Sequence, residues 1–571
     1  MALKTIFHEV EFCVIGGGLS GMGAAISAAR HGIKTLLMHE RPVPGGNASS
    51  EIRMWVCGSK LLMETGLIEE LRLKNLYRNN SANYSIWDSI TYEMVAMQEN
   101  LTVLFNCSCQ DAEMDGAKII SVTGYQQTTQ QYHQVRAKMF ADCSGDSILA
   151  PLTGAEFRIG REAKSEFGET LAQDQPDRHT MGMSCLLQAR EMPTPQKFIP
   201  PSWAYSYPTE ESLPPRGHKM ERLQNFWWVE LGGMDDSIAD TETLRDELLK
   251  TMFGIWDHMK NHGDHGVENF AVDWVGFLPG KRESRRYVGD YILNEKDILS
   301  GNCFHDAVAY GGWPIDDHHP AGFLHKGEAN LNILLEKNYT VPLRSLYSRN
   351  VENLLFAGRN ISATHTALSS TRVMATCMML GQAAGTAASV ALKKDKTIRQ
   401  TAREDYAEIQ QLLLEDDCTL PGMNRSVAAE IRSAKLYSNC GNPEVLRSGI
   451  DRDYPGEENF WIGKLGDSVT YEYSEIRRFS TIRLVFDSNL ARLKNHGHLN
   501  LPANYFLNAP GQEVPATLMK SFAVFADGRE ICRVDDNHQR LFRINIPFAA
   551  KSVEFRPLDS DPKKLFAFEV R

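Results

Sequence analysis

The sequence lacks the features of an exported or membrane-spanning protein. Its first 18 residues, MALKTIFHEVEFCVIGGG, contain no apolar core followed by a small-residue cleavage site. No apolar run reaches the roughly 18 residues that a membrane helix needs, since even 373–391 is rich in Gly, Ala, Ser and Thr. The eleven cysteines include no CxxC pair, which favours reduced thiols. We therefore expect a cytoplasmic protein with no membrane partner.

A strong charge bias is also lacking. The net charge of −11 is dispersed along the chain, which disfavours a nucleic-acid partner. No tract is compositionally biased, and 42% of the residues are hydrophobic, as in globular proteins. Because 571 residues are too many for one core, we expect several domains.

The first 40 residues contain a strand, a glycine turn and a helix. Residues 11–15 (EFCVI) are β-rich, and GGGLSG and the helix-compatible MGAAISAARHG follow at once. The first glycine allows the tight turn, the second the approach of a pyrophosphate, and the third the packing of helix on strand. Free N–H groups at the helix N-terminus favour an anion. The predicted phosphate-binding residues are Gly16, Gly18, Leu19, Ser20 and Gly21.

An acidic residue follows at the spacing that a dinucleotide site requires. A second strand, residues 33–38, ends just before Glu40, where a carboxylate can accept hydrogen bonds from both adenosine ribose hydroxyls. Gly32 is expected to end the preceding helix in a left-handed conformation. Together these features predict a dinucleotide-binding βαβ unit.

Three further segments resemble the glutathione-reductase-like superfamily of FAD proteins. RPVPGGN (41–47) resembles the segment beside the flavin, and 101–142, read as three strands ending in ADCSGD, resembles the β-meander and the turn near the adenosine. VENLLFAGRN (351–360) resembles the late strand that returns to the first sheet. The resemblance implies FAD as the cofactor, and it adds the binding residues Arg41, Gly45, Gly46, Asn47, Ser144, Gly145, Asp146, Gly358 and Arg359.

A helix of small residues is predicted over 373–392, with Ser369, Ser370 and Thr371 as its N-cap. In the resembling proteins such a helix begins at the flavin. Its positive end would stabilise negative charge on the reduced ring. Ser370, Thr371 and Arg372 are therefore predicted to bind the cofactor.

In this order the motifs are similar to those of the bacterial FAD-dependent oxidoreductase family, over roughly residues 10–395. The distinctive motifs are LPGKRESRRYVGDYIL from Leu278, GWPIDDHHP from Gly312, VPLRSLY from Val341 and AGRNISATH from Ala357. A disulfide reductase would need a redox CxxxxC and a second GxGxxG, which are absent. Gly358-Arg359 stands where aromatic hydroxylases have Gly-Asp. NASS (47–50) offers no histidine for a flavin tether, so non-covalent FAD is implied, with Cys57 the one nearby residue that would change this.

The candidate catalytic residues are His318, Asp316, Arg282 and His365. A histidine near neutral pKa suits a base beside the carbon that loses hydride, and Asp316 would hold the His318 tautomer. Arg282 would anchor a substrate, and His365 is a rival base because it should lie near the flavin. The alternative is that Arg282 pairs with Glu283 and that DDHH (316–319) is a solvated loop.

No metal site is predicted. His258, His262 and His265, like the DDHH segment, are ligand types, but no complementary ligand set is identifiable from spacing.

The C-terminal part changes to short β-runs separated by turns, which predicts an all-β sandwich. GIDRDYP (449–455), Trp461 and the closing FAFEVR resemble a discoidin-like, galactose-binding jelly roll. Such a module binds carbohydrate or packs as a structural or oligomer-forming domain.

The predicted fold class is α/β: a Rossmann-like FAD-binding domain (1–150 and 346–395) with an inserted α+β substrate domain (151–345), a helical connector (396–432) and a jelly-roll sandwich (433–571). The predicted function is transfer of a hydride between non-covalent FAD and a small polar organic substrate, a class that includes sugar derivatives. Two alternatives stay open, a flavin-dependent monooxygenase and a carbohydrate-binding protein with a vestigial flavin fold.

Overall fold

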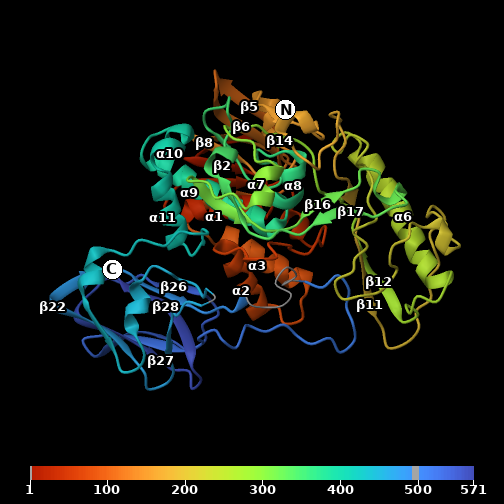
Figure 1. Cartoon of the computed structure of the whole chain (residues 1–571). Helices are drawn as coiled ribbons and strands as arrows, with labels where there is room; N and C mark the ends of the chain where they lie inside the picture. The colour runs from red at the N-terminus through yellow and green to blue at the C-terminus, as the bar shows by residue number, and fades with distance from the viewer. Residues whose placement is uncertain (1–2, 455, 491–500) are drawn as a thin grey trace. The chain divides into compact units, whose positions relative to one another are not determined.

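A computed structural model describes residues 3–454, 456–490 and 501–571 (Figure 1). The chain forms two compact units. The first, called the cavity unit below, comprises Met1–Glu64, Ala82–Gln410 and Gly497–Gly511, and the second, the β-rich unit, comprises Thr65–Ser81, Gln411–His496 and Gln512–Arg571. These limits differ from the predicted boundaries, because composition does not show which core a helix or a connecting segment packs on.

A five-stranded parallel sheet lies at the centre of the cavity unit, in the order β19-β8-β2-β3-β4. Four short runs of apolar character, FCVI, TLLM, MFAD and LLF, are buried along their whole length, as strands covered on both faces are. The α/β prediction with a parallel sheet is confirmed. The strands are β2 (Phe12–Ile15), β3 (Thr35–Met38), β4 (Leu101–Leu104), β8 (Met139–Asp142) and β19 (Leu354–Phe356).

Two helices of small residues, α1 (Leu19–Arg30) and α9 (Met374–Lys393), pack backbone against backbone beside β2 and β8 (Figure 1). A Cβ atom added at Gly381 would lie 1.9 Å from the carbonyl oxygen of Ser20, so only glycine permits this approach. By length and composition alone α9 could cross a membrane, but 94% of its most apolar window is buried inside the protein. The small residues therefore serve close packing.

The region 101–142 differs from the three predicted strands. The first predicted strand is split at Asn106, which has a φ of +53°, and the last is split before Met139. Their outer parts, β4 and β8, join the parallel sheet, whereas the meander consists of β5 (Cys107–Asp115), β6 (Lys118–Gln126) and β7 (Gln131–Arg136), with β1 (Thr5–Glu9) parallel to β7. Local β-propensity does not show which sheet a strand joins.

The middle of the cavity unit combines one long helix with pairs of antiparallel strands. Helix α6 (Thr241–Asn261) buries Leu248, Met252, Ile255 and Trp256 in a core of its own. The strand pairs are β9 (Phe157–Arg158) with β14 (Arg286–Tyr287), β10 (Met183–Ser184) with β13 (Gly280–Lys281), β11 (Leu187–Glu191) with β12 (Phe270–Val275), β15 (Ala307–Gly311) with β18 (Tyr339–Pro342), and β16 (Ile315–His318) with β17 (Asn330–Ile333).

Shorter helices complete the cavity unit. They are α3 (Tyr84–Ala96), α4 (Leu149–Thr153), α5 (Lys164–Phe167), α7 (Glu295–Ser300), α8 (His365–Thr371) and α10 (Ile398–Glu404). Helix α11 (Tyr406–Glu415) crosses the limit between the units, and α2 (Leu67–Arg78) and α12 (Ala429–Ser433) belong to the β-rich unit.

The β-rich unit contains two antiparallel sheets, in the orders β20-β22-β27-β24-β25 and β21-β28-β23-β26. This arrangement is consistent with the predicted sandwich. Its discoidin-like character stays a prediction, and Pro455 of the segment that carries the resemblance lies outside the described residues. The strands are β20 (Lys435–Ser438), β21 (Trp461–Gly463), β22 (Val469–Phe479), β23 (Ile482–Phe486), β24 (Phe522–Ala526), β25 (Arg529–Val534), β26 (Leu541–Ile544), β27 (Phe548–Pro557) and β28 (Lys563–Val570).

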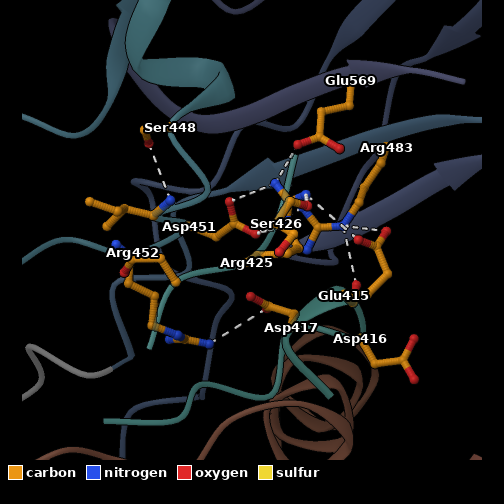
Figure 2. A network of polar contacts seen from close by, with 12 residues as sticks. Glu415, Asp416, Asp417, Arg425, Ser426, Ser448, Asp451, Arg452, Arg483 and Glu569 are labelled. Atoms are coloured by element: carbon orange, nitrogen blue, oxygen red, sulfur yellow. Dashed lines mark hydrogen bonds and ion pairs between the residues drawn. The ribbon is translucent and has the colours of Figure 1, made fainter. Parts of the chain in front are cut away.

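A network of buried charges ties the β-rich unit together (Figure 2). Arg425 is paired with Asp451 at 2.9 Å and with Glu569, and Arg483 with Asp451 at 2.9 Å and with Glu415 at 3.3 Å. Burial alone would raise the pKa of Asp451, but the two arginines lower it to about 2. The carboxylate is thus held charged by cations that are themselves buried.

Candidate active site

The parallel sheet opens at the carboxyl ends of its strands into a cavity of about 640 Å³. This is the edge at which ligands bind in open α/β sheets. The glycine turn after β2, the segment after β3 and the turn after β8 contribute one part of its lining. The start of α9, the segment 278–282 and strands β16 and β17 contribute another part. Elements far apart in sequence therefore share one site.

The glycine turn has the geometry that the sequence predicts. Gly16 has a φ of +95°, and a Cβ atom there would lie 2.5 Å from Ser144 Cα. A Cβ atom at Gly21 would lie 1.7 Å from the Gly16 carbonyl oxygen, so α1 begins in contact with the turn. Gly17 N–H donates to His39 Nδ1 at 2.9 Å. His39, which sequence reasoning missed, thereby fixes the turn from the end of β3.

The polar groups around this turn fit an anionic ligand. Gly18, the N-cap of α1, has no side-chain cap, so the N–H groups of the first turn receive no side-chain acceptor there. Within the described part of the chain, the buried Nε atoms of Arg359 and Arg372 have no hydrogen-bond partner. Among the described lining residues, basic side chains outnumber acidic ones: Arg41, Lys281, Arg282, Arg359 and Arg372 against Glu40, Asp146 and Asp316. This excess of positive charge suits a diphosphate.

Asp146 holds Arg359 in the wall of the cavity. Its carboxylate accepts from Arg359 Nη2 at 2.6 Å, Lys281 Nζ at 2.7 Å and Ser284 Oγ at 2.8 Å. Although burial would raise the pKa of Asp146, Arg359 and Lys281 lower it to about 2. The predicted residues Asp146 and Arg359 therefore meet, although the chain between them spans most of the middle region.

The DDHH segment is not a solvated loop. Residues 315–318 form β16, paired with β17, and Asp316 and His318 both line the cavity. Asp317 lies between them and contacts His365 instead, as the alternation of side chains along a strand requires. The loop alternative is wrong because β17 pairs with this segment, with Asn332 opposite Asp316 and Asn330 opposite His318, and local sequence does not reveal this pairing.

A carboxylate that the sequence did not single out holds His318. Glu230 Oε2 lies 2.7 Å from His318 Nδ1, whereas Asp316 Oδ2 lies 3.4 Å from Nε2. Both ring nitrogens of His318 therefore face a carboxylate: Glu230 is the closer, at Nδ1, and Asp316, which was predicted to hold the tautomer, contacts Nε2. Arg282 pairs with the same Glu230 at 3.3 Å, not with Glu283. Glu230 was missed because 88 residues separate it from His318.

Asp316 is bound from three sides. It accepts from Trp313 Nε1 and Arg372 Nη2, each at 3.2 Å, and from Asn330. Burial would raise the pKa of Asp316, but His318 and Arg372 together hold it far below its usual range. Asp316 is therefore a carboxylate at any working pH.

His365 does not serve as a base in this geometry. It is absent from the described lining of the cavity, and its ring is held by Glu283 at 2.9 Å and Asp317 at 2.9 Å. Burial alone would lower the pKa of His365, but the two carboxylates raise it to about 10. The ring is a cation at neutral pH, so the prediction of a rival base is wrong. Although burial would raise the pKa of Asp317, the His365 charge lowers it.

The helix at the cavity starts later than predicted. Ser369, Ser370 and Thr371 belong to α8, whose N-cap is Thr364, and α9 has Val373 as its N-cap without a side-chain cap. Ser370 Oγ contacts Tyr339 Oη at 2.8 Å, and neither Ser370 nor Thr371 is among the described lining residues. The N-cap prediction failed because these three residues lie inside a separate short helix, whose N-cap Thr364 accepts from Ala367 N–H at 3.2 Å.

The remaining predicted residues can be placed directly. The cavity is lined by Gly16, Gly18, Leu19, Ser20, Glu40, Arg41, Gly45, Gly46, Asn47, Ser144, Gly145, Asp146, Arg282, Asp316, His318, Gly358, Arg359 and Arg372. Residues that sequence reasoning did not select also line it, among them Trp227, Lys281, Asn330, Asn332 and Met374. Their roles toward a cofactor or substrate stay predictions.

A family model described as FAD dependent oxidoreductase matches residues 11–413. The chain belongs to this family. It is an oxidoreductase enzyme, and FAD is its cofactor. The alternative of a non-catalytic protein with a vestigial flavin fold is therefore wrong. No curated protein matches the sequence.

Solved structures show distant likenesses. The chain is 12% identical to a geranylgeranyl bacteriochlorophyll reductase-like protein from Thermoplasma acidophilum, covering 72% of this chain and 85% of that one at a TM-score of 0.32. It is 9% identical to p-nitrophenol 4-monooxygenase PnpA from Pseudomonas putida DLL-E4, covering 72% and 86% at 0.31. L-proline dehydrogenase from P. horikoshii is matched at 18% identity and a TM-score of 0.17, over 25% of this chain and only 24% of that one.

Proposed function

We propose that the enzyme binds FAD non-covalently and exchanges a hydride with a small, uncharged, hydroxyl-bearing molecule, a class that includes sugar derivatives. The observation that carries the proposal is the buried His318 imidazole in the wall of the cavity, with Nδ1 held by Glu230 at 2.7 Å. Nε2 is then the nitrogen that would exchange a proton with a substrate, beside the Asp316 carboxylate at 3.4 Å.

Bound FAD supplies the group that accepts or donates the hydride. During oxidation of an alcohol, His318 Nε2 takes the hydroxyl proton as the C–H bond is broken, and in the reverse direction it returns that proton. Glu230 stabilises the resulting imidazolium, and Asp316, 3.4 Å from Nε2, adds a second negative charge. Trp227, which also lines the cavity, packs edge-on against the imidazole, with ring centroids 5.1 Å apart.

The lining around His318 supports a neutral polar substrate. Arg282 is paired with Glu230, and Arg372 with Asp316, so these cations already have counter-charges. Asn332 and the aromatic rings of Trp227 and Trp313 also line the cavity. Amides and carboxylates bind hydroxyl groups, and indole faces pack on the C–H faces of a sugar or polyol.

Cys57 supports non-covalent attachment. It lines the cavity, but burial raises the pKa of its thiol to about 12. A thiol in this state is a poor nucleophile toward the flavin ring. A covalent bond between Cys57 and the flavin, which the sequence left open, is therefore disfavoured.

The proposal is tested by mixing the yellow enzyme anaerobically with sugars, polyols, amines and hydroxy acids and by following the flavin absorbance. We expect a sugar or polyol to bleach the flavin with stoichiometric formation of a carbonyl product, and acid precipitation to release all flavin into the supernatant. Bleaching by NAD(P)H alone, followed by oxygen insertion into an aromatic substrate, would instead establish a monooxygenase and contradict the proposal.

A further inference from the structure

Outside the cavity, four potential metal ligands meet in the middle region of the cavity unit. They are Glu210, His218, His258 and His265, and their ligand atoms all lie within 4.8 Å of one another. Glu210 and His218 come from the long segment between β11 and α6, His258 from the last turns of α6, and His265 from the loop that follows. The prediction of no metal rested on the lack of a complementary ligand set, and tertiary structure supplies one.

The spacing of the ligand atoms suits tetrahedral coordination. The Glu210 carboxylate lies 3.2 Å from His258 Nε2, 3.4 Å from His265 Nε2 and 3.4 Å from His218 Nδ1. Ligands bound to zinc at about 2.0–2.1 Å in a tetrahedron are about 3.3 Å apart. The three imidazole centroids lie 4.8–5.7 Å from one another, so the rings surround one point rather than stack.

The hydrogen bonds and the burial of the three histidines also fit metal binding. His258 is fully buried, and its Nδ1–H donates to the Tyr207 carbonyl oxygen at 2.6 Å, which directs the Nε2 lone pair toward Glu210. His218 is more than nine-tenths buried, and within the described residues its Nε2 has no hydrogen bond; Nε2 of His265 also has none, and it lies 3.4 Å from the Glu210 carboxylate. Buried imidazoles without partners are costly unless something binds them.

We propose that Glu210, His218, His258 and His265 bind one structural zinc ion. Three imidazoles and one carboxylate form a four-coordinate set of borderline and hard donors that suits Zn²⁺. His262, on the same short stretch of sequence, is not part of the site, because it is paired with Asp257 at 3.3 Å.

The ion would tether the segment that leads to the cavity. His218 packs edge-on against Trp228, with ring centroids 5.7 Å apart, and the adjacent Trp227 lines the cavity. The Trp227 carbonyl oxygen accepts from Arg282 Nη2 at 2.9 Å. Zinc binding would therefore stabilise the segment 207–228 against local unfolding, independently of the chemistry proposed for the FAD site.

The test is metal analysis of the full-length holoenzyme after dialysis against metal-free buffer. We expect about one zinc ion per chain, and removal by a chelator should make the segment 207–228 sensitive to limited proteolysis while flavin stays bound. Replacement by Co²⁺ should give the visible absorption bands of a tetrahedral site. His265→Gln, at a ligand whose side chain is only 10% exposed, should weaken zinc binding on the order of a hundredfold, whereas the matched control His262→Gln should leave it unchanged.

Glu210→Gln serves as a second variant, since this side chain is 60% exposed and its replacement does not threaten folding. It should also weaken zinc binding. The proposal is overturned if the wild-type protein binds no zinc even after incubation with excess Zn²⁺, if it retains another metal in preference, or if His262→Gln loses zinc as fully as His265→Gln. None of these outcomes depends on turnover, so failure of the proposed function leaves the test intact.

Discussion

The cavity unit and the β-rich unit each bury a network of charges, and the two networks differ in what surrounds them. Around Arg425 and Asp451, the described lining encloses only about 20 Å³, and the ten residues labelled in Figure 2 include no histidine. Around Asp316 and Arg372, the network includes His318 and borders a cavity of about 640 Å³.

Burial of charge is therefore not by itself a mark of catalysis. Asp451 and Asp316 both have pKa values lowered by neighbouring cations despite burial. What distinguishes the cavity is an imidazole in its wall and space for a reacting molecule beside it. In the β-rich unit the same types of residue hold segments together.

The largest expected difference between the networks concerns His318. His318→Gln should lower kcat/KM by about 10²–10⁴-fold, because proton transfer to and from the substrate is lost. The measurement is steady-state kinetics with the substrate found by flavin bleaching, together with flavin content and Tm. His319→Gln is the matched control, since His319 is exposed and outside the described cavity lining. Equal loss in both variants would remove His318 from the mechanism.

For the charge network of the β-rich unit we expect a loss of stability without a loss of activity. Asp451→Asn leaves Arg425 and Arg483 without one of their carboxylates and should lower the free energy of unfolding by about 3–5 kcal/mol. Urea denaturation measures this loss, with the exposed Asp535→Asn as control. Because Asp451 belongs to the β-rich unit, kcat/KM should stay unchanged below the unfolding transition. A large fall in the kcat/KM of the fully folded Asp451→Asn variant would contradict this distinction between the two networks.

Glu230 tests how the cavity network acts on its histidine. Glu230→Gln keeps the volume but removes the charge that stabilises the His318 imidazolium, and we expect a fall in kcat of about 10–100-fold. As a positioning residue, Glu230 should also shift the acidic limb of the pH–rate profile, which a merely structural role would not move. An unchanged pH profile with lowered Tm would reduce Glu230 to a packing role.

The last comparison separates the two units by the pH at which each loses stability. The pKa of His365 is raised to about 10, so its stabilisation is complete below about 6.5 and is lost as the pH rises toward 10, by at most about 1.4 kcal/mol per pH unit. The pKa of Asp451 is lowered to about 2, so its stabilisation is present above about 3.9 and is lost as the pH falls toward 2.

Calorimetry of His365→Gln and Asp451→Asn over a range of pH measures both the alkaline and the acidic loss of stability. His365→Gln should flatten the alkaline loss of stability, and Asp451→Asn should flatten the acidic loss. If the alkaline limb survives His365→Gln, that histidine is not the group that titrates.

Predictions from sequence succeeded where one short segment carries the whole signal. Gly16 needs a positive φ and Gly21 needs contact with the turn, and both requirements are local. Glu40 lies at the cavity because a strand of predictable length leads to it. The strand at 354–356 was also expected, from its apolar run and the Gly-Arg after it.

Predictions failed where a residue's role depends on a distant partner. His365 was expected to act as a base, but Glu283 and Asp317 come from two other segments and make it a permanent cation near neutral pH. Glu230 carries no local motif. For the same reason Glu210 and His218, two of the proposed zinc ligands, were not recognised, whereas His258 and His265 were considered together with His262.

The sequence by itself determined the dinucleotide turn, the parallel sheet and the change to antiparallel strands near the C-terminus, because backbone conformation and hydrophobic periodicity are properties of neighbouring residues. Only the tertiary structure decided which histidine faces the cavity and which is locked as a cation. The reason is that protonation depends on charges and burial within a few ångströms, and the residues that provide them come from distant parts of the chain.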